Sequence, residues 1–205
     1  MIDPAILITA FVALFVVIDP IGLTPLFVTL TQGTAPDARR SIALRACLIA
    51  FAILTAFAIF GEAVLGFIGI SMPAFRVAGG ALLFLTALDM LFERRAPRRE
   101  GQAGEERPDP SVFPLALPLI SGPGSIATII LLSSQQTDAI GLAAVIGVAF
   151  AVLLVVFALF LASGLLERLL GKTGINIATR LMGMLLAALA VQFILDGLTA
   201  FGFAG

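Results

Sequence analysis

The 205-residue sequence contains no histidine, no tryptophan and no tyrosine, and only one cysteine. Without histidine the chain cannot form a Ser-His or Cys-His dyad or a histidine-ligated catalytic metal site. Ser125 has no evident base in the sequence, so these absences argue against an enzyme. Cys47 has no partner for a disulfide within the chain, and its apolar neighbours indicate simple helix packing.

Charge is also scarce, and this places the chain in a membrane. Hydrophobic residues make up 60% of the sequence and charged residues 12%, with a mean hydropathy of +1.13. Soluble domains carry about a quarter of charged residues. A membrane span needs roughly 20 apolar residues. Six stretches meet this requirement: about 5–30, 42–65, 73–92, 112–134, 139–166 and 177–203. The expected fold is therefore an all-α membrane protein with six transmembrane helices.

Lysine and arginine are distributed unevenly among the predicted loops. Eleven of the 12 basic residues fall in the odd-numbered loops, and Arg76 alone falls on the other side. Because short cytoplasmic loops collect Lys and Arg, we expect these loops in the cytoplasm and both termini outside. The start of the chain lacks a basic signal-peptide region, so we expect the first span to be retained.

Two proline-glycine segments interrupt long apolar runs, one in each half of the chain. They are Asp19-Pro20-Ile21-Gly22 and Gly122-Pro123-Gly124-Ser125. Helix breakers inside an apolar span are tolerated where the backbone lines a cavity or is buried in protein. Breaks at corresponding positions of two halves point to a transporter whose site lies between the repeats. We therefore expect spans 1 and 4 to be broken near the membrane midplane.

The two halves come into register when the chain is shifted by about 103 residues. Pro20 then falls on Pro123, and one residue further Arg76 falls on Arg180. Each half holds three spans, an odd number, so the second repeat must be inverted relative to the first. This predicts a first three-helix repeat in 1–92, a charged cytoplasmic linker in 93–111, and a second three-helix repeat in 112–205.

The chemistry of the breaks suggests a substrate site. Pro fits the first position of a helix and Asp is a favoured N-cap, so new half-helices are expected to begin at Pro20 and Pro123. Their N-termini would present unpaired N–H groups to an anion. A zwitterion could place its carboxylate on the second break and its ammonium near Asp19. The predicted substrate-binding residues are Asp19, Pro20, Gly22, Thr24, Gly122, Pro123, Gly124 and Ser125.

Asp19 has an alternative role as a simple helix cap. We favour a functional carboxylate, because burying it at mid-membrane costs on the order of 3 kcal/mol and Ser or Asn would cap more cheaply. Other charged residues near span ends either anchor the helices or form symmetry-related gate pairs, Glu62 with Arg76 and Glu167 with Arg180. The coupling or gating candidates are Asp19, Glu62, Arg76, Asp89, Glu167 and Arg180.

Three segments of this sequence resemble the MarC family of bacterial inner-membrane proteins. They are Phe15–Phe27 around Asp19-Pro20, Phe75–Leu91 around Arg76-Val77-Ala78-Gly79-Gly80, and Phe113–Ile126 around Ser121-Gly122-Pro123-Gly124. The resemblance covers essentially the whole chain. It implies the three-plus-three architecture of LysE-type exporters and membership of a class of six-span neutral amino acid transporters.

The leading hypothesis is thus a secondary transporter of small neutral amino acids, without cofactor and coupled to protons or sodium. Two alternatives remain open. A divalent-cation carrier is disfavoured because the second break, unlike the first, offers no acidic residue. A non-transporting membrane or envelope-stress protein would be separated from a carrier only by its lack of response to ligands. The expected partners are the lipid bilayer, a small-molecule substrate and, optionally, a second copy of the chain; no nucleic acid is expected.

Overall fold

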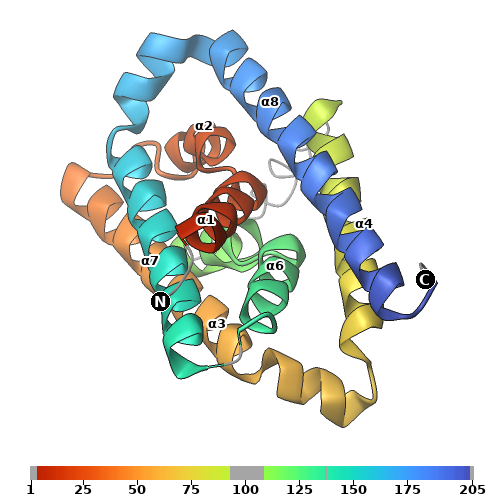
Figure 1. The fold of residues 1–205 in the computed structure, drawn as a ribbon. Helices are drawn as coiled ribbons and strands as arrows, with labels where there is room; N and C mark the ends of the chain where they lie inside the picture. Colours follow the sequence, from red (N-terminus) through yellow and green to blue (C-terminus); the bar gives the residue numbers. More distant parts are fainter. Residues whose placement is uncertain (1–3, 93–108, 137, 204–205) are drawn as a thin grey trace.

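The computed structural model describes residues 4–92, 109–136 and 138–203, and this part of the chain is helical without strands (Figure 1). The linker predicted at 93–111 lies mostly outside the described residues. The elements are α1 (Pro4–Ile18), α2 (Pro20–Leu30), α3 (Pro36–Ile68), α4 (Met72–Leu91), η1 (Ser111–Ile120), α6 (Pro123–Ser133), α7 (Ala139–Leu161) and α8 (Ser163–Ala200).

Five apolar segments are each long enough to cross a bilayer: Ile6–Leu30, Pro36–Ile68, Met72–Leu91, Ala139–Leu161 and Thr173–Ala200. η1 and α6 together form a sixth if the pair, which is bent by 57°, is taken as one span. These segments correspond to the six stretches predicted from hydropathy. α3 begins earlier than predicted because Pro36 occupies its first position and Asp37 lies in its first turn, both favourable at a helix N-terminus.

Two elements are less regular than expected. In η1 the residues that precede Pro114 and Pro118 adopt extended backbone angles, because proline disfavours the helical region for the residue before it. The predicted fifth span runs to residue 166, but α7 ends at Leu161 and α8 starts at Ser163. Gly171 then kinks α8 through a positive φ of 58°, which glycine adopts without steric cost.

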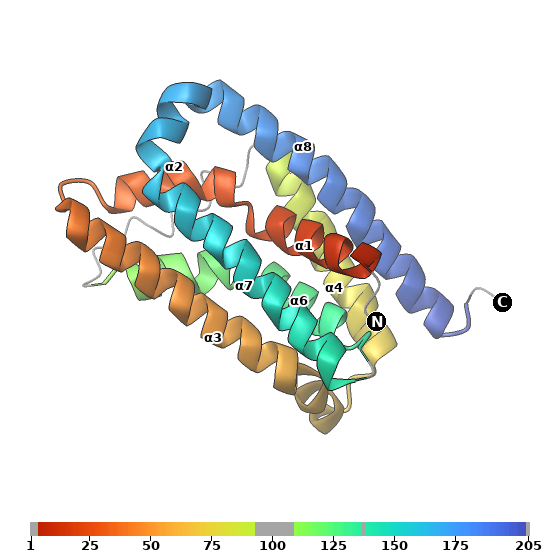
Figure 2. The ribbon, with the colours of Figure 1, turned by 60° about the vertical axis from the view of Figure 1, so that its left-hand side comes forward.

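α1 and α6 lie at the centre of the molecule, surrounded by α3, α4, α7 and α8 (Figure 1). Figure 2 shows that α1 begins and α8 ends at the same end of the bundle, where α6 also connects to α7. The α2–α3 and α7–α8 connections lie at the opposite end. The helices therefore divide the loops between two ends, as membrane-spanning helices do.

α4 and α8 form the most extensive helix pair, and glycines bring their backbones together. A Cβ on Gly80 would lie 2.8 Å from the carbonyl oxygen of Ala190, and one on Gly183 would lie 3.2 Å from that of Ala87. Only glycine permits this approach without a shift of the neighbours. The pair runs antiparallel, because the contact moves forward along α4, from Gly80 to Ala87, as it moves backward along α8, from Ala190 to Gly183.

The buried residues of this pair recur at a spacing of 103. Four buried positions on α4 correspond to four on α8: Gly80 to Gly183, Leu83 to Leu186, Ala87 to Ala190 and Met90 to Phe193. This register differs by one residue from the sequence alignment of Arg76 with Arg180. The buried faces of α4 and α8 are therefore related by a spacing of 103, and the two arginines by a spacing of 104.

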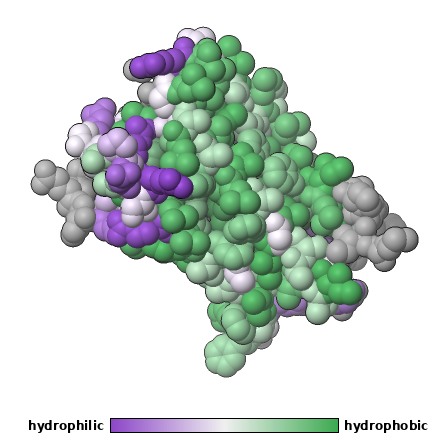
Figure 3. Space-filling model, turned by 90° about the vertical axis from the view of Figure 1, so that its left-hand side faces the viewer, coloured by the Kyte–Doolittle hydropathy of each residue, from purple (hydrophilic) through white to green (hydrophobic). Residues whose placement is uncertain are grey.

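The surface is unusually apolar for a folded chain. Figure 3 shows one side of the molecule covered mainly by hydrophobic residues, with most hydrophilic residues gathered at one edge. Large side chains such as Phe67 and Phe60 are 94% and 61% exposed. In water such a surface would aggregate, whereas in a bilayer it faces acyl chains.

Candidate functional site

Asp19 separates α1 from α2 and is completely buried. Its backbone is left-handed (φ 56°, ψ 65°), a conformation that Asp adopts more readily than most residues. Its Oδ1 accepts a hydrogen bond of 3.0 Å from the Gly22 N–H, and Pro20 is the first residue of α2. Asp19 is thus the N-cap of α2, as the sequence predicts.

Gly22 is required by the position of that carboxylate. A Cβ at residue 22 would lie 2.1 Å from Oδ2 of Asp19, far inside contact distance. In the structure Gly22 thus makes room for the capping carboxylate. Its predicted role in substrate binding stays a prediction.

The second break joins η1 to α6 through Ser121 and Gly122, and the backbone of Gly122 is extended. Pro123 opens α6, and no side chain caps this helix end. A Cβ on Gly122 would lie 2.5 Å from the carbonyl oxygen of Pro118, so the turn requires glycine. The Ser121 hydroxyl donates to the carbonyl oxygen of Ala50 at 3.3 Å and ties the break to α3.

The two breaks lie next to each other. A Cβ on Gly124 would be 3.1 Å from Cγ2 of Val17, which is two residues before Asp19. On its other side it would be 3.4 Å from Cδ2 of Leu83 and 3.8 Å from Oγ1 of Thr86, both on α4. The start of α6 is therefore packed between the end of α1 and the middle of α4.

Polar side chains are concentrated in and after the breaks, although the surrounding core is apolar. Thr24 and Thr128 donate to the carbonyl oxygens of Pro20 and Gly124, at 3.0 and 2.8 Å, which satisfies both hydroxyls within their own helices. The buried polar residues of this region, each no more than 3% exposed, are Asp19, Thr24, Ser121, Ser125 and Thr128.

Sequence reasoning missed three of the polar residues near the breaks: Thr86, Ser121 as a contact to α3, and Thr128. Each is a hydroxyl residue inside an apolar run. A hydroxyl residue within a membrane span could have indicated these positions, because polar residues are unfavourable there without a partner or a function.

The remaining charged candidates lie on the outer helices. Glu62 is exposed on α3, and Arg76, in the first turns of α4, has a buried Nε without a hydrogen-bond partner. These two residues form no ion pair in this structure. Asp89 lies toward the end of α4, and Arg180 is exposed on α8. The side chain of Glu167 is outside the described part, so the predicted Glu167–Arg180 pair stays a prediction.

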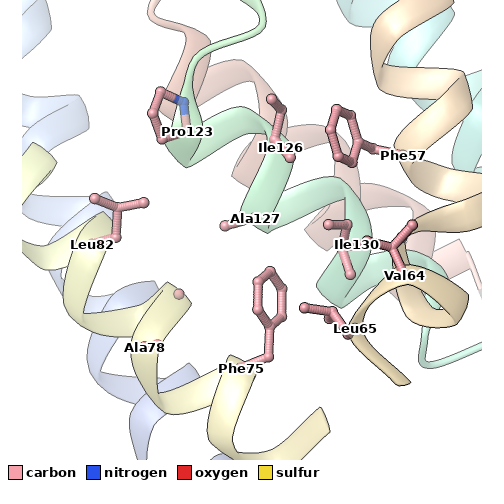
Figure 4. A pocket seen from close by; sticks show the side chains of 12 residues that line it. Phe57, Val64, Leu65, Phe75, Ala78, Leu82, Pro123, Ile126, Ala127 and Ile130 are labelled. Atoms are coloured by element: carbon pink, nitrogen blue, oxygen red, sulfur yellow. The ribbon is translucent and has the colours of Figure 1, made fainter. Parts of the chain in front are cut away.

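An apolar cavity of about 430 Å³ lies between α3, α4 and α6 and begins at the second break (Figure 4). Its walls include Phe57 on α3, Phe75 on α4, and Pro123 and Ile130 on α6. The cavity lining contains apolar residues and glycines only. Within the described residues, no three His, Cys, Asp or Glu side chains group closely enough to hold a metal ion.

The apolar surface, the membrane-length helices and the buried breaks define a multi-pass integral membrane protein. Residues 5–201 match the sequence profile of a protein family described as MarC family integral membrane protein. The chain belongs to the MarC family.

Named relatives support this membership across nearly full lengths. The chain is 40% identical to the UPF0056 membrane protein YvbG of Bacillus subtilis, over 94% of this chain and 93% of the relative. It is 39% identical to a UPF0056 membrane protein of Methanocaldococcus jannaschii, over 93% and 95%. It is 38% identical to the UPF0056 inner membrane protein YhgN of Escherichia coli, over 94% and 95%. No solved structure matches the chain.

Proposed function

We propose that this protein is a secondary transporter of small neutral amino acids, or similar small zwitterions, across the inner membrane. One observation carries the proposal: the uncapped start of α6 lies against the end of α1, directly before the buried Asp19. A partial positive charge and a carboxylate are thereby held near each other in an apolar protein. A zwitterion has the complementary charges.

The proposed roles follow from these charges. The substrate carboxylate would accept hydrogen bonds from the first N–H groups of α6, around Gly124 and Ser125. The ammonium would lie toward Asp19, which is also our candidate for binding a coupling proton or sodium ion. Close packing around Gly124 leaves little space, which favours glycine, alanine or serine over larger substrates. No cofactor is included in this proposal.

The proposed site lies between two inverted repeats, with both breaks near the membrane midplane. The matching buried faces of α4 and α8 support the repeat. The pattern of helix packing also supports it. α1 contacts α7, and η1, the counterpart of α1, contacts α3, the counterpart of α7. α3 and α7, which are counterparts of each other, are themselves in contact. In a structure with twofold-related halves, contacts occur in such reciprocal pairs.

We further propose that the α2–α3 and α7–α8 connections face the cytoplasm and both termini face outside. The support is the excess of basic residues that follow these connections, in the first turns of α3 and the first part of α8, together with the shared end of α1 and α8 in Figure 2. The Escherichia coli relative YhgN is named an inner membrane protein, which supports the proposed location.

A ligand screen tests the proposed function. Purified protein in detergent should show a concentration-dependent rise in Tm with glycine, alanine or serine. Proteoliposomes that contain the protein should then accumulate the ligand that raises Tm when a proton or sodium gradient is applied. A response to Mg²⁺ or Mn²⁺ instead would favour the cation carrier. No response to any ligand class would favour a non-transporting membrane protein.

A further inference from the structure

Four side chains form a compact cluster between α2, α3, α7 and α8, at the bundle end that carries the α2–α3 connection. The rings of Phe27 and Phe160 stack with centroids 4.3 Å apart and planes 2° apart. The guanidinium carbon of Arg39 lies 5.1 Å from the centroid of Phe27, and its Nη2 donates to the Ser163 hydroxyl. We call Phe27, Arg39, Phe160 and Ser163 the Arg39 cluster. Phe27, Phe160 and Ser163 are completely buried.

The cluster has a counterpart in the other half of the molecule, and that counterpart is open. At the spacing of 103 that matches α4 with α8, Phe27 corresponds to Ile130 and Phe160 to Phe57. Ile130 and Phe57 line the cavity between α3, α4 and α6 (Figure 4). Arg39 and Ser163 correspond to Leu142 and Phe60, so the polar contact of the cluster has no equivalent there.

The same contrast continues toward the breaks. Leu23 and Thr24, which are completely buried about one turn before Phe27 on α2, correspond to Ile126 and Ala127, which line the cavity. Equivalent positions of the two halves are thus packed shut at one end of the molecule and hollow at the other. A transporter with two related halves alternates between two conformations, and each conformation alone is asymmetric in this way.

We infer that the Arg39 cluster is a gate, closed in this structure, between the breaks and the face that carries the α2–α3 connection. On this inference, the cavity that begins at Pro123 and continues along α6 to Ile130 is the path toward the opposite face. Opening the gate requires Arg39 to leave Ser163 and Phe27 to separate from Phe160. Closing the cavity then brings Phe57 toward Ile130. This inference rests on the proposed transport function.

Reciprocal accessibility of two cysteines tests the gate. Cys47→Ala provides a background without thiols, in which Thr24→Cys reports on the gate side and Ala127→Cys on the cavity side. A membrane-impermeant cationic methanethiosulfonate is applied to each face of oriented vesicles. In the parent, residue 127 should react from the cavity face, and residue 24 should react slowly from the gate face. Arg39→Ala, or the milder Ser163→Ala, should accelerate labelling at residue 24 several-fold and slow labelling at residue 127.

Arg40→Ala is the matched control, because Arg40 is an exposed neighbour outside the cluster. It should leave both rates unchanged. Faster labelling at residue 24 without slower labelling at residue 127 would mean local loosening and would overturn the gate. Unchanged rates in monodisperse Arg39→Ala and Ser163→Ala proteins, or no reaction of residue 127 in the parent, would overturn it as well. Since no substrate is added, these outcomes are independent of which molecule the protein transports.

Discussion

The carboxylate of Asp19 occupies the space that a side chain on Gly22 would need, since the Cβ position of Gly22 lies 2.1 Å from Oδ2 of Asp19. The capping of α2 by Asp19 therefore depends on the absence of a side chain at residue 22. Changing either residue alone disturbs both.

Gly22→Ala should destabilise the protein by about 1–3 kcal/mol, because the added methyl forces the buried carboxylate away from its cap position. Thermal unfolding in detergent would measure this as a lower Tm. Gly147→Ala is the control, because no atom outside the backbone of its own helix and its chain neighbours lies within 4 Å of its Cβ position. Alanine is the better helix former there, so that variant should gain up to about 1 kcal/mol. Equal Tm values for both variants would contradict the assigned role of Gly22.

Asp19→Asn should fold and remain monodisperse but lose ion-driven accumulation in proteoliposomes. Asparagine keeps a capping oxygen and tolerates the left-handed backbone of residue 19, while it removes the charge. Asp19→Ala, which lacks the capping oxygen, should lower Tm as well. If Asp19→Asn accumulated ligand with unchanged ion dependence, residue 19 would be a cap only, and the search would move to Glu62, Asp89, Glu167 and Asp196.

Gly124→Val should weaken binding of glycine, alanine or serine more than it lowers expression, because its side chain would crowd the proposed carboxylate site beside Val17 and Leu83. Gly124→Ala is the smaller change, and its Cβ would lie 3.1 Å from Cγ2 of Val17. Adding Val17→Ala should recover the stability lost in Gly124→Ala, a coupling that a double-mutant cycle measures. Unaltered ligand affinity in Gly124→Val would remove this glycine from the site.

Asp109 should make stability depend on acid pH. The Ser111 hydroxyl and N–H, and the Arg45 guanidinium 2.9 Å away, hold the pKa of Asp109 below its ordinary value of 3.8. A lowered carboxyl pKa stabilises the folded state above the unfolded-state pKa, and this contribution disappears as the pH falls through the folded-state value. Asp109→Asn should therefore be less stable than the parent at pH 7, by less than about 1 kcal/mol. The difference should vanish well below pH 3.8.

Reporter fusions should reveal the orientation. A periplasm-active reporter should work when fused after α8 and fail when inserted near Gly101, because basic residues hold that region in the cytoplasm. A cytoplasm-active reporter at the same two positions serves as the control and should give the reverse result. Activity of the periplasmic reporter only near Gly101 would invert the proposed topology.

The sequence is informative wherever structure depends on neighbouring residues. Pro20 and Pro123 are sufficient to predict that helices begin there, and α2 and α6 do begin at these residues. Hydropathy likewise predicts the membrane-length segments. Resemblance to the MarC family, carried by three motifs, is confirmed by the match over residues 5–201.

Features that depend on distant residues could not be predicted in this way. The contact between Arg39 and Ser163 joins residues 124 apart, and nothing local to either residue indicates it. The approach of Gly124 to Val17 is similarly set by how α1, α4 and α6 pack together. The kink at Gly171 could not be predicted for another reason. A glycine in a polar stretch is equally compatible with a helix end, a loop or a kink.

The glycine contacts of α4 and α8 bear on how such a chain could have originated. In an antiparallel pair, the contact of Gly80 with Ala190 and that of Gly183 with Ala87 are the same contact made twice. A half-length ancestor inserted into the membrane in both orientations could therefore have formed this interface with its own copy. Under the proposed inverted repeat, gene duplication and fusion would then have preserved the interface, and the arginines of the odd-numbered loops would have fixed the proposed orientation of each half.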